Sequence, residues 1–394
     1  MSGLAKQSPK KPTLLMAASV FIALSASMTA LADGPAVIAK ADQHLWPEAI
    51  NTAAGFDKAS RASLLIYVLA LRDMQKLSDA EMLSSFKIKS INRPSVEKWL
   101  KKERALSLEN YRLSAKNCIA SDWTCLSGAM SYEALLKKAD TDKLQKPGNL
   151  LAWQENLKKF SRSYLAEQLR LAALFPRITS EIDTFNNQEW TGDSLPDRRF
   201  YLSFDDGPTA ANGANSTTDS TLAMLSEKKK SAVFFLLGEN LQNRLNASSS
   251  TKLKSLYQNQ CVASHGWQHQ SHAKWEQWQS SVQRTQVLLK TTFAANDVLP
   301  LFRPPYGQRK ADSSAFFQAQ TLKVALWNLD SQDWNDQVNI NDITNRMLTL
   351  MLIKRHGVLL FHDVHPKAQA ALPIMFDALG DSVEWGACDE LGKI

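Results

Sequence analysis

Reactive side chains follow five short apolar runs in the C-terminal half of this 394-residue sequence. Runs of this length are typical of buried strands, and polar helical stretches separate them. In a barrel of parallel strands the carboxyl ends meet at one mouth, where active sites lie. The sequence therefore predicts one site built from several strand ends. The runs and their following residues are FYLSF with Asp205 and Asp206, CVAS with His265, LPLF with Arg303, KVALWNL with Asp330, and GVLLF with His362.

Asp206, His265 and His269 form a candidate metal site. One carboxylate and two imidazoles bind Zn²⁺ or a similar divalent cation and leave positions open for water and substrate. The four-residue spacing of the histidines favours a helical turn that presents both imidazoles to one ion. His272 is a competing ligand, and such a histidine pair is by itself more often structural. We expect Zn²⁺ as the cofactor.

Asp205 and Asp206 are adjacent, so their side chains project differently and suit different roles. If Asp206 binds the cation, Asp205 remains beside the attacking water and can accept its proton. Gly207 and Pro208 predict a tight turn that lets the backbone leave the strand at the mouth. The alternative is a surface turn without chemistry.

Five ordered motifs resemble those of the polysaccharide deacetylases, carbohydrate esterase family 4. They are SFDDGP at 203–208, SHGWQH at 264–269, FRPPYG at 302–307, DSQDW at 330–334 and LLFHD at 359–363. The resemblance covers about residue 198 to the C-terminus. It implies a distorted (β/α) barrel, a divalent metal and hydrolysis of N-acetyl groups on a glycan. Gly266 departs from the family, which usually has Ser or Thr there, where a hydroxyl would brace the loop between the ligands.

The resemblance also implies roles for individual residues. It makes Asp205 the general base beside the three metal ligands, and Arg303 the group that orients this base. Tyr306 would donate its backbone N–H to the oxyanion. His362 would be the general acid that protonates the departing amine, and Asp333 would pair with His362 and raise its pKa. The pocket for the acetyl methyl would be walled by Trp334 and Leu360.

The first half of the chain has the apolar spacing of helices between residues 56 and 175. The pattern predicts helices over 63–76, after the capping box of Ser78 and Glu81, after Pro94, and over about 150–174. The polar segment 186–198 predicts a boundary. We therefore expect a signal peptide over 1–32, an all-helical accessory domain over 33–190 and the α/β catalytic domain over 191–394.

The N-terminal segment has the pattern of an export signal. Three lysines precede an uncharged, mainly apolar run over 12–32 that ends in small residues, which predicts cleavage after Ala32. The alternative is an uncleaved membrane anchor, since the run is long enough to span a bilayer. With cleavage, we expect a periplasmic or secreted protein without stable membrane insertion.

The four cysteines follow this segment. An oxidising compartment and an even count favour disulfides, and we expect Cys118 with Cys125 and Cys261 with Cys388. Four buried thiols are the alternative. No CxxC pair occurs in the sequence, which argues against zinc binding by cysteines.

Composition and charge exclude several classes of protein. Hydrophobic residues make up 44% and charged residues 22%, which excludes a disordered, collagen-like or multi-spanning chain. The formal net charge of +7 falls to +4 without the three lysines of the signal segment, too small a surplus to specify nucleic acid. The partner we expect is an N-acetylated glycan, and the sequence leaves the oligomeric state open.

The leading hypothesis is an exported metal-dependent hydrolase that removes N-acetyl groups from N-acetylglucosamine units, with peptidoglycan as the favoured polymer. A second hypothesis keeps the barrel but takes another amide as the substrate. A third is a glycan-binding module that has lost turnover. The presence of both Asp205 and His362 argues against the third, because a binder needs neither an acid nor a base.

Overall fold

The computed structural model describes residues 1, 3, 35, 37–126, 130–141, 150–210 and 216–393. The predicted signal peptide, apart from residues 1 and 3, lies outside the described residues, and so does its cleavage site. Residues 35–394 form one compact unit. Within the described part of the chain, no helix combines the length and apolar character needed to cross a bilayer.

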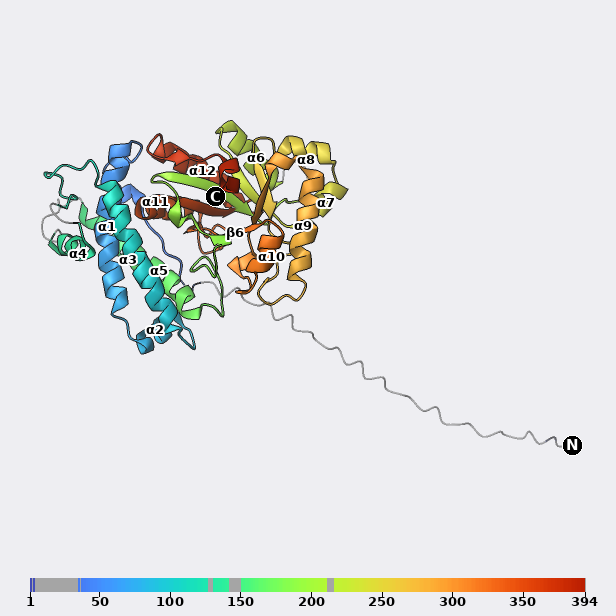
Figure 1. Cartoon of the computed structure of the whole chain (residues 1–394), viewed down its shortest axis with the longest axis horizontal. Coiled ribbons are helices and arrows are strands. Elements are labelled where there is room, and N and C mark those ends of the chain that lie inside the picture. The colour runs from blue at the N-terminus through green and yellow to red at the C-terminus, as the bar shows by residue number, and fades with distance from the viewer. Residues whose placement is uncertain are drawn as a thin grey trace. The chain divides into compact units, whose positions relative to one another are not determined.

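Helices make up the described region before the sheet, as predicted (Figure 1). The capping box of Ser78 and Glu81 opens the second helix, and Pro94 lies in the first turn of the third, whose N-cap is Asn92. The first helix begins earlier than the predicted residue 63, because Thr52 caps it. The bounds are α1 Ala53–Gln75, α2 Asp79–Phe86, α3 Arg93–Ser114, α4 Tyr132–Thr141 and α5 Leu151–Leu174.

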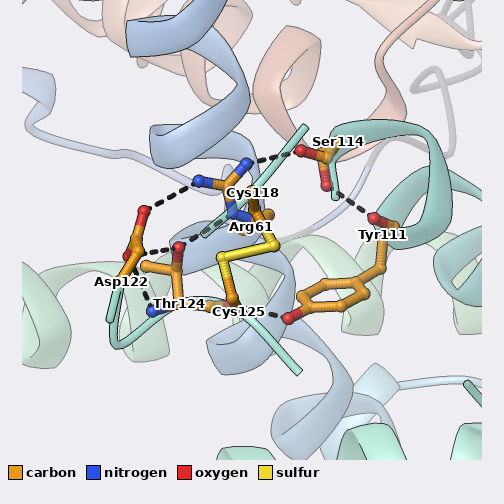
Figure 2. Close-up of a disulfide and its surroundings, with 7 residues drawn as sticks. All are labelled: Arg61, Tyr111, Ser114, Cys118, Asp122, Thr124 and Cys125. Carbon is orange, nitrogen blue, oxygen red and sulfur yellow. Dashed lines mark hydrogen bonds and ion pairs between the residues drawn. A yellow bond between two sulfur atoms is a disulfide. The ribbon is translucent and has the colours of Figure 1, made fainter. Parts of the chain in front are cut away.

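The disulfide between Cys118 and Cys125 closes a short loop after α3 (Figure 2). Arg61, a buried residue of α1, points into this loop and donates to Thr124 Oγ1 and Asp122 Oδ2 at 2.9 Å each. The loop is therefore fastened to α1 by a buried guanidinium as well as closed by the disulfide.

The second half of the chain is a parallel sheet covered by helices, in the order β1-β6-β5-β4-β3-β2-β8-β7, with β9 beside the start of β2. The predicted α/β class and distorted (β/α) barrel are confirmed. The strands are β1 Glu189–Trp190, β2 Arg199–Asp205, β3 Ala232–Leu236, β4 Cys261–Ser264, β5 Val298–Phe302, β6 Lys323–Ala325, β7 Leu329–Asp330, β8 Gly357–His362 and β9 Glu384–Trp385. The helices are α6 Thr217–Glu227, α7 Gly238–Asn246, α8 Ser250–Leu256, α9 Trp278–Thr292, α10 Ser314–Ala319, α11 Ile340–Lys354 and α12 Pro366–Leu379.

One predicted strand is in fact two, β6 and β7. We call the segment between them, from Ala325 to Leu329, the seam of the barrel. KVALWNL was expected to be a single strand, which is wrong: it contributes β6 near one end of the sheet order and β7 at the other. The chain crosses from one end to the other between Ala325 and Leu329. Arg303 donates to the carbonyls of Ala325 and Leu326 at 3.1 Å each. A buried side chain therefore satisfies backbone acceptors at the point where the strand stops.

Alternation along the strands divides the apolar residues into two cores. Tyr201, Val233 and Leu360 belong to the core inside the barrel, while Phe204 and Phe361 belong to the core beneath the helices. The core beneath the helices, which contains Phe204 and Phe361, is continuous with the core of the N-terminal helices. The disulfide between Cys261 and Cys388 joins β4 to the last turn of the chain, so both predicted cysteine pairings are confirmed.

Buried polar contacts join the N-terminal helices to α11. Ser60 of α1 donates to the carbonyl of Leu352 at 2.7 Å, and Asn110 of α3 donates to that of Ile353 at 3.1 Å. Lys354 forms a buried ion pair with Glu103 of α3 at 2.7 Å. The helical region therefore packs directly on the barrel. The proposed domain limits at 32 and 190 remain predictions.

Candidate active site

The reactive side chains converge at the carboxyl ends of four strands. Asp205 is the last residue of β2 and lies in register with His362 at the end of β8. His265 directly follows β4, and Arg303 directly follows β5. Because these strands are parallel, their ends meet at one mouth of the barrel. Residues far apart in the sequence are thus brought to one mouth, as four of the five apolar runs predicted.

Asp206, His265 and His269 are brought together with ligand atoms within 4.8 Å of one another. Asp206 Oδ1 lies 3.3 Å from His265 Nε2 and 3.5 Å from His269 Nε2. A tetrahedral Zn²⁺ with ligands at roughly 2.0–2.1 Å spaces its ligand atoms about 3.3 Å apart. The donor set and its spacing therefore fit a Zn²⁺ ion.

Two further observations support a cation at this position. Asp206 Oδ1 is buried and makes no hydrogen bond to a described residue. His265 Nδ1 lies 2.7 Å from the carbonyl oxygen of Arg303, which can only accept, so the proton is on Nδ1 and Nε2 offers a lone pair.

A loop, and not the predicted helical turn, carries the two histidine ligands. Gly266 has φ +83°, a value that favours glycine, and it turns the backbone directly after His265. Beyond it, His269 is partly exposed, with 34% of its side chain accessible. His272, the competing ligand, lies outside the triad, and its ring nitrogens contact Gln270 and Ser281 instead.

Asp205 is held by a buried arginine. Arg303 Nη1 donates to Asp205 Oδ1 at 2.8 Å and to Ser203 Oγ at the same distance. Its other nitrogens bind the seam carbonyls, so the guanidinium is fixed on every side, and neither Arg303 nor Asp205 is appreciably exposed. Asp205 Oδ2 is the oxygen nearer the triad, 3.8 Å from His265 Nε2. This geometry orients the carboxylate toward the metal site.

His362 is paired with a fully buried carboxylate. Its Nδ1 lies 2.7 Å from Asp333 Oδ1, and its backbone N–H donates to Asp333 Oδ2 at 2.8 Å. Burial lowers the pKa of His362, but Asp333 outweighs this effect, and with Asp206 and Asp205 it raises the pKa to about 10. The imidazolium form is therefore favoured at neutral pH. Since Nδ1 is engaged by Asp333, the Nε2–H is the proton available to a substrate.

Tyr306 lies in a strained turn beside the triad. Its φ is +59°, and the amides of Gly307 and Gln308 close the turn by donating to Pro304 and Pro305. The residue is 48% exposed, and its ring lies edge-on to His269, with ring centroids 4.3 Å apart. The aromatic side chain therefore stands at the mouth of the site.

The two predicted pocket residues differ in exposure. Leu360 is buried within the barrel, while Trp334 is half-buried after the loop that carries Asp333. Their contacts with an acetyl group remain a prediction.

Arg309 is a supporting residue that sequence reasoning missed. It is buried, donates to the carbonyls of Gly307 and Ser180 at 2.9 and 2.8 Å, and pairs with Glu189 of β1. These contacts fasten the Tyr306 turn to the segment that follows α5. Arginine two residues after the FRPPYG motif was the only local signal, and it could not reveal a partner 120 residues away.

Asp363 is a second residue that was missed. It is fully buried, and Thr218 donates to its Oδ2 at 2.6 Å, while Oδ1 makes no hydrogen bond to a described residue. Burial raises its pKa to about 7. It packs against Gly207, where a Cβ would lie 2.2 Å from its carboxylate. Asp363 thus lies beneath the turn that follows Asp206.

Comparison with known proteins identifies the family that the motifs resemble. The sequence model of the Polysaccharide deacetylase family matches residues 192–325, which contain the first three motifs. The peptidoglycan-N-acetylmuramic acid deacetylase PdaC of Bacillus subtilis (strain 168) is 28% identical over 46% of this chain and 35% of its own length. The peptidoglycan-N-acetylglucosamine deacetylase of Bacillus cereus is 26% identical over 45% of this chain and 64% of its own length.

A solved structure of a family 4 carbohydrate esterase from Streptomyces lividans has 25% identity and a TM-score of 0.41, and the match covers 49% of this chain and 95% of that one. The fold assignment therefore rests on the strand order of this chain itself. The matches to both curated relatives span less than two thirds of those proteins. The resemblance of the C-terminal half to the polysaccharide deacetylases is confirmed.

Proposed function

We propose that this protein is an exported, metal-dependent hydrolase that removes N-acetyl groups from N-acetylglucosamine units of a polysaccharide, with peptidoglycan favoured. The observation that carries the proposal is the pairing of a buried base with an opposing acid around one ligand triad. Asp205 is fixed by Arg303, and His362 by Asp333. A module that only binds glycans would need neither pair.

Asp206, His265 and His269 would hold the cation, for which Zn²⁺ suits one carboxylate and two imidazoles. When bound, it supplies Lewis-acid polarisation of the amide and lowers the pKa of water. His265 is kept in the ligating tautomer by the carbonyl of Arg303. The same arginine thus positions both the base and one ligand.

Asp205 is the proposed general base. Arg303 occupies Oδ1, so Oδ2 is the oxygen that accepts a proton from the attacking water. The water oxygen then bonds to the acetyl carbon, and the carbonyl electrons move onto the carbonyl oxygen. The backbone N–H of Tyr306 is the proposed donor to this oxyanion.

His362 is the proposed general acid. An amine is a poor leaving group until it is protonated, and the raised pKa of His362 keeps a proton on Nε2 at neutral pH. As the carbon–nitrogen bond breaks, its electron pair takes this proton, and acetate and a free amine are released. Trp334 and Leu360 are the proposed walls around the acetyl methyl.

Peptidoglycan is favoured for two reasons. The export signal predicted over residues 1–32 would deliver the protein to the cell envelope, and the two curated relatives described above are named as peptidoglycan deacetylases. A different amide as substrate remains the second candidate, because the acid, base and triad would serve any accessible amide at the barrel mouth.

Acetate release tests the proposal. The Zn²⁺-loaded full chain would be incubated with peptidoglycan, chitin oligomers and poly-N-acetylglucosamine, and free acetate measured from each. Asp205→Asn keeps an oxygen acceptor for Arg303 and should lower the rate by about 10²- to 10⁴-fold in variant protein that still folds, as checked by circular dichroism. Asp336→Asn, a change at an exposed carboxylate, is the matched control. Failure of the wild-type protein to release acetate from any of the three polymers would refute the proposal.

A further inference from the structure

Gly266 stands beside a histidine that leaves no room for a side chain. A Cβ at position 266 would lie 2.6 Å from His272 Cε1, 2.7 Å from its Nε2 and 3.0 Å from Ser281 Oγ. Real Cβ atoms do not approach heavy atoms as closely as 2.6 Å. The imidazole of His272 therefore fills the space in which the family's Ser or Thr side chain would begin.

Hydrogen bonds link His272 and Ser281 to both ends of the ligand loop. His272 Nδ1 lies 2.8 Å from the carbonyl oxygen of Gln270, its Nε2 lies 3.0 Å from Ser281 Oγ, and the N–H of Trp267 donates to Ser281 Oγ at 2.7 Å. The Gln270 carbonyl can only accept, so Nδ1 carries the proton and Nε2 accepts from the Ser281 hydroxyl. Burial lowers the pKa of His272 to about 4, so the ring is neutral. Each group in this series of hydrogen bonds can then act as the donor or acceptor that its neighbour requires.

The hydrogen bonds of His272 and Ser281 hold both ends of the segment between His265 and His269. Trp267 is two residues after His265, and Gln270 is one residue after His269. Both His272 and Ser281 are buried, and Ser281 belongs to α9, a helix outside the loop. The loop is thus tied to a rigid element at the points that set the direction of the two imidazoles.

We propose that His272 and Ser281 replace the missing hydroxyl at position 266 and position His265 and His269 for the cation. The glycine at position 266 and the histidine at position 272 then belong together, because a side chain at 266 and an imidazole at 272 would occupy the same space. This inference rests on the proposed metal site. His272 acts through the ligands and is a positioning residue.

Zn²⁺ affinity tests the positioning role. The dissociation constant would be measured on the purified full chain by competition with a chromophoric chelator. His272→Phe keeps a ring but removes both nitrogens, and it should weaken Zn²⁺ binding by about 10- to 100-fold, as other losses of outer ligand support do. Ser281→Ala should have a similar effect, and the double variant should be no worse than the more severe single one.

Thr285→Val is the matched control for these variants. Thr285 is buried one turn further along α9, and its hydroxyl donates to the carbonyl of Ser281 and not to the loop. Its Zn²⁺ affinity should stay within about 3-fold of wild type. Wild-type affinity in His272→Phe, or an equal loss in Thr285→Val, would overturn the positioning role.

A second measurement needs no metal and is independent of the proposed function. Gly266→Ser would be made in the wild-type and in the His272→Ala backgrounds, and thermal unfolding of the apo protein followed. Strain from φ +83° is the same in both backgrounds and cancels in the cycle. The unfolding midpoint should fall further in the wild-type background, where the clash exists. An equal decrease of the unfolding midpoint in both backgrounds would overturn the proposed steric exclusion between a side chain at 266 and the imidazole at 272. A wild-type protein that binds no Zn²⁺ would refute only the metal site.

Discussion

Asp333→Asn offers the sharpest test of the acid assignment, because it removes the charge that most strongly raises the pKa of His362. The whole rise, from an ordinary 6.5 to about 10, corresponds to about 5 kcal/mol of preference for the imidazolium. At pH 8 a pKa of about 10 leaves His362 about 99% protonated, and a pKa of 6.5 leaves it about 3% protonated. A variant that loses the whole rise is then expected to lose about 30-fold of its activity at pH 8 through protonation alone.

The loss should shrink as the pH falls. At pH 6 a group of pKa 6.5 is still about 76% protonated, so the same change costs little through protonation. The assay is acetate release from chitin oligomers between pH 5.5 and 10.5 at saturating Zn²⁺, with Asp336→Asn as the control. The alkaline limb of the profile should move to lower pH in Asp333→Asn and stay in place in the control.

A bound cation would offset the contributions of Asp206 and Asp205 to the pKa of His362, but it would leave the contact with Asp333 intact. The direction of the shift between wild type and variant is therefore the decisive quantity. An equal loss of activity at every pH, with the alkaline limb unmoved, would refute the acid assignment. Stability gives a parallel check. Because the pKa of His362 is raised in the folded protein, the stabilisation from its ion pair with Asp333 is complete below pH 6.5 and is lost as the pH rises through about 10.

Further predictions concern other supports of the site. Arg303→Met should lower the free energy of unfolding by about 3–5 kcal/mol, because it leaves Asp205 buried without its partner; a denaturant titration showing less than about 1 kcal/mol would contradict this. Arg309→Met should lower kcat while leaving Zn²⁺ affinity nearly unchanged, since it holds the Tyr306 turn and no ligand. Replacing both Cys261 and Cys388 by Ser should cost about 2–5 kcal/mol of stability, measured by thermal unfolding under oxidising conditions. Treatment with a chelator should abolish acetate release and lower the unfolding midpoint, and Zn²⁺ should restore both; full activity after chelation argues against metal dependence.

The strand ends were predictable because their signal is local. A run such as GVLLF is apolar at every position, since a barrel strand faces one core inside and another beneath the helices. The polar residue that follows marks the point where the strand reaches the mouth. The helix starts were predictable for the same reason, since the capping box at Ser78 and the proline at 94 act within one turn.

The seam was not predictable from KVALWNL. After the exposed Lys323, its other six residues are buried or half-buried, whether they belong to β6, to the crossing or to β7. Only the closure of the sheet decides where the strand must stop, and Arg303, from another strand, provides the donors that let it stop there.

The helical turn predicted for His265 and His269 fails for a related reason. A four-residue spacing suits a helix, but a φ of +83° at Gly266 turns the chain into a loop, and His272 with Ser281 fixes that loop. The sequence shows the glycine as a departure from the family. The compensating imidazole is visible only once α9 is packed against the loop.

The sequence therefore decides which residue types are present and that they follow buried strands. Strand length, burial and capping each produce a pattern among near neighbours in the sequence. Which atoms face one another is decided by tertiary structure. The contacts of Asp205 with Arg303 and of Arg309 with Glu189 join residues 98 and 120 positions apart, and no local pattern encodes such a pairing. Closure of the barrel supplies it, by bringing the carboxyl ends of parallel strands to one rim.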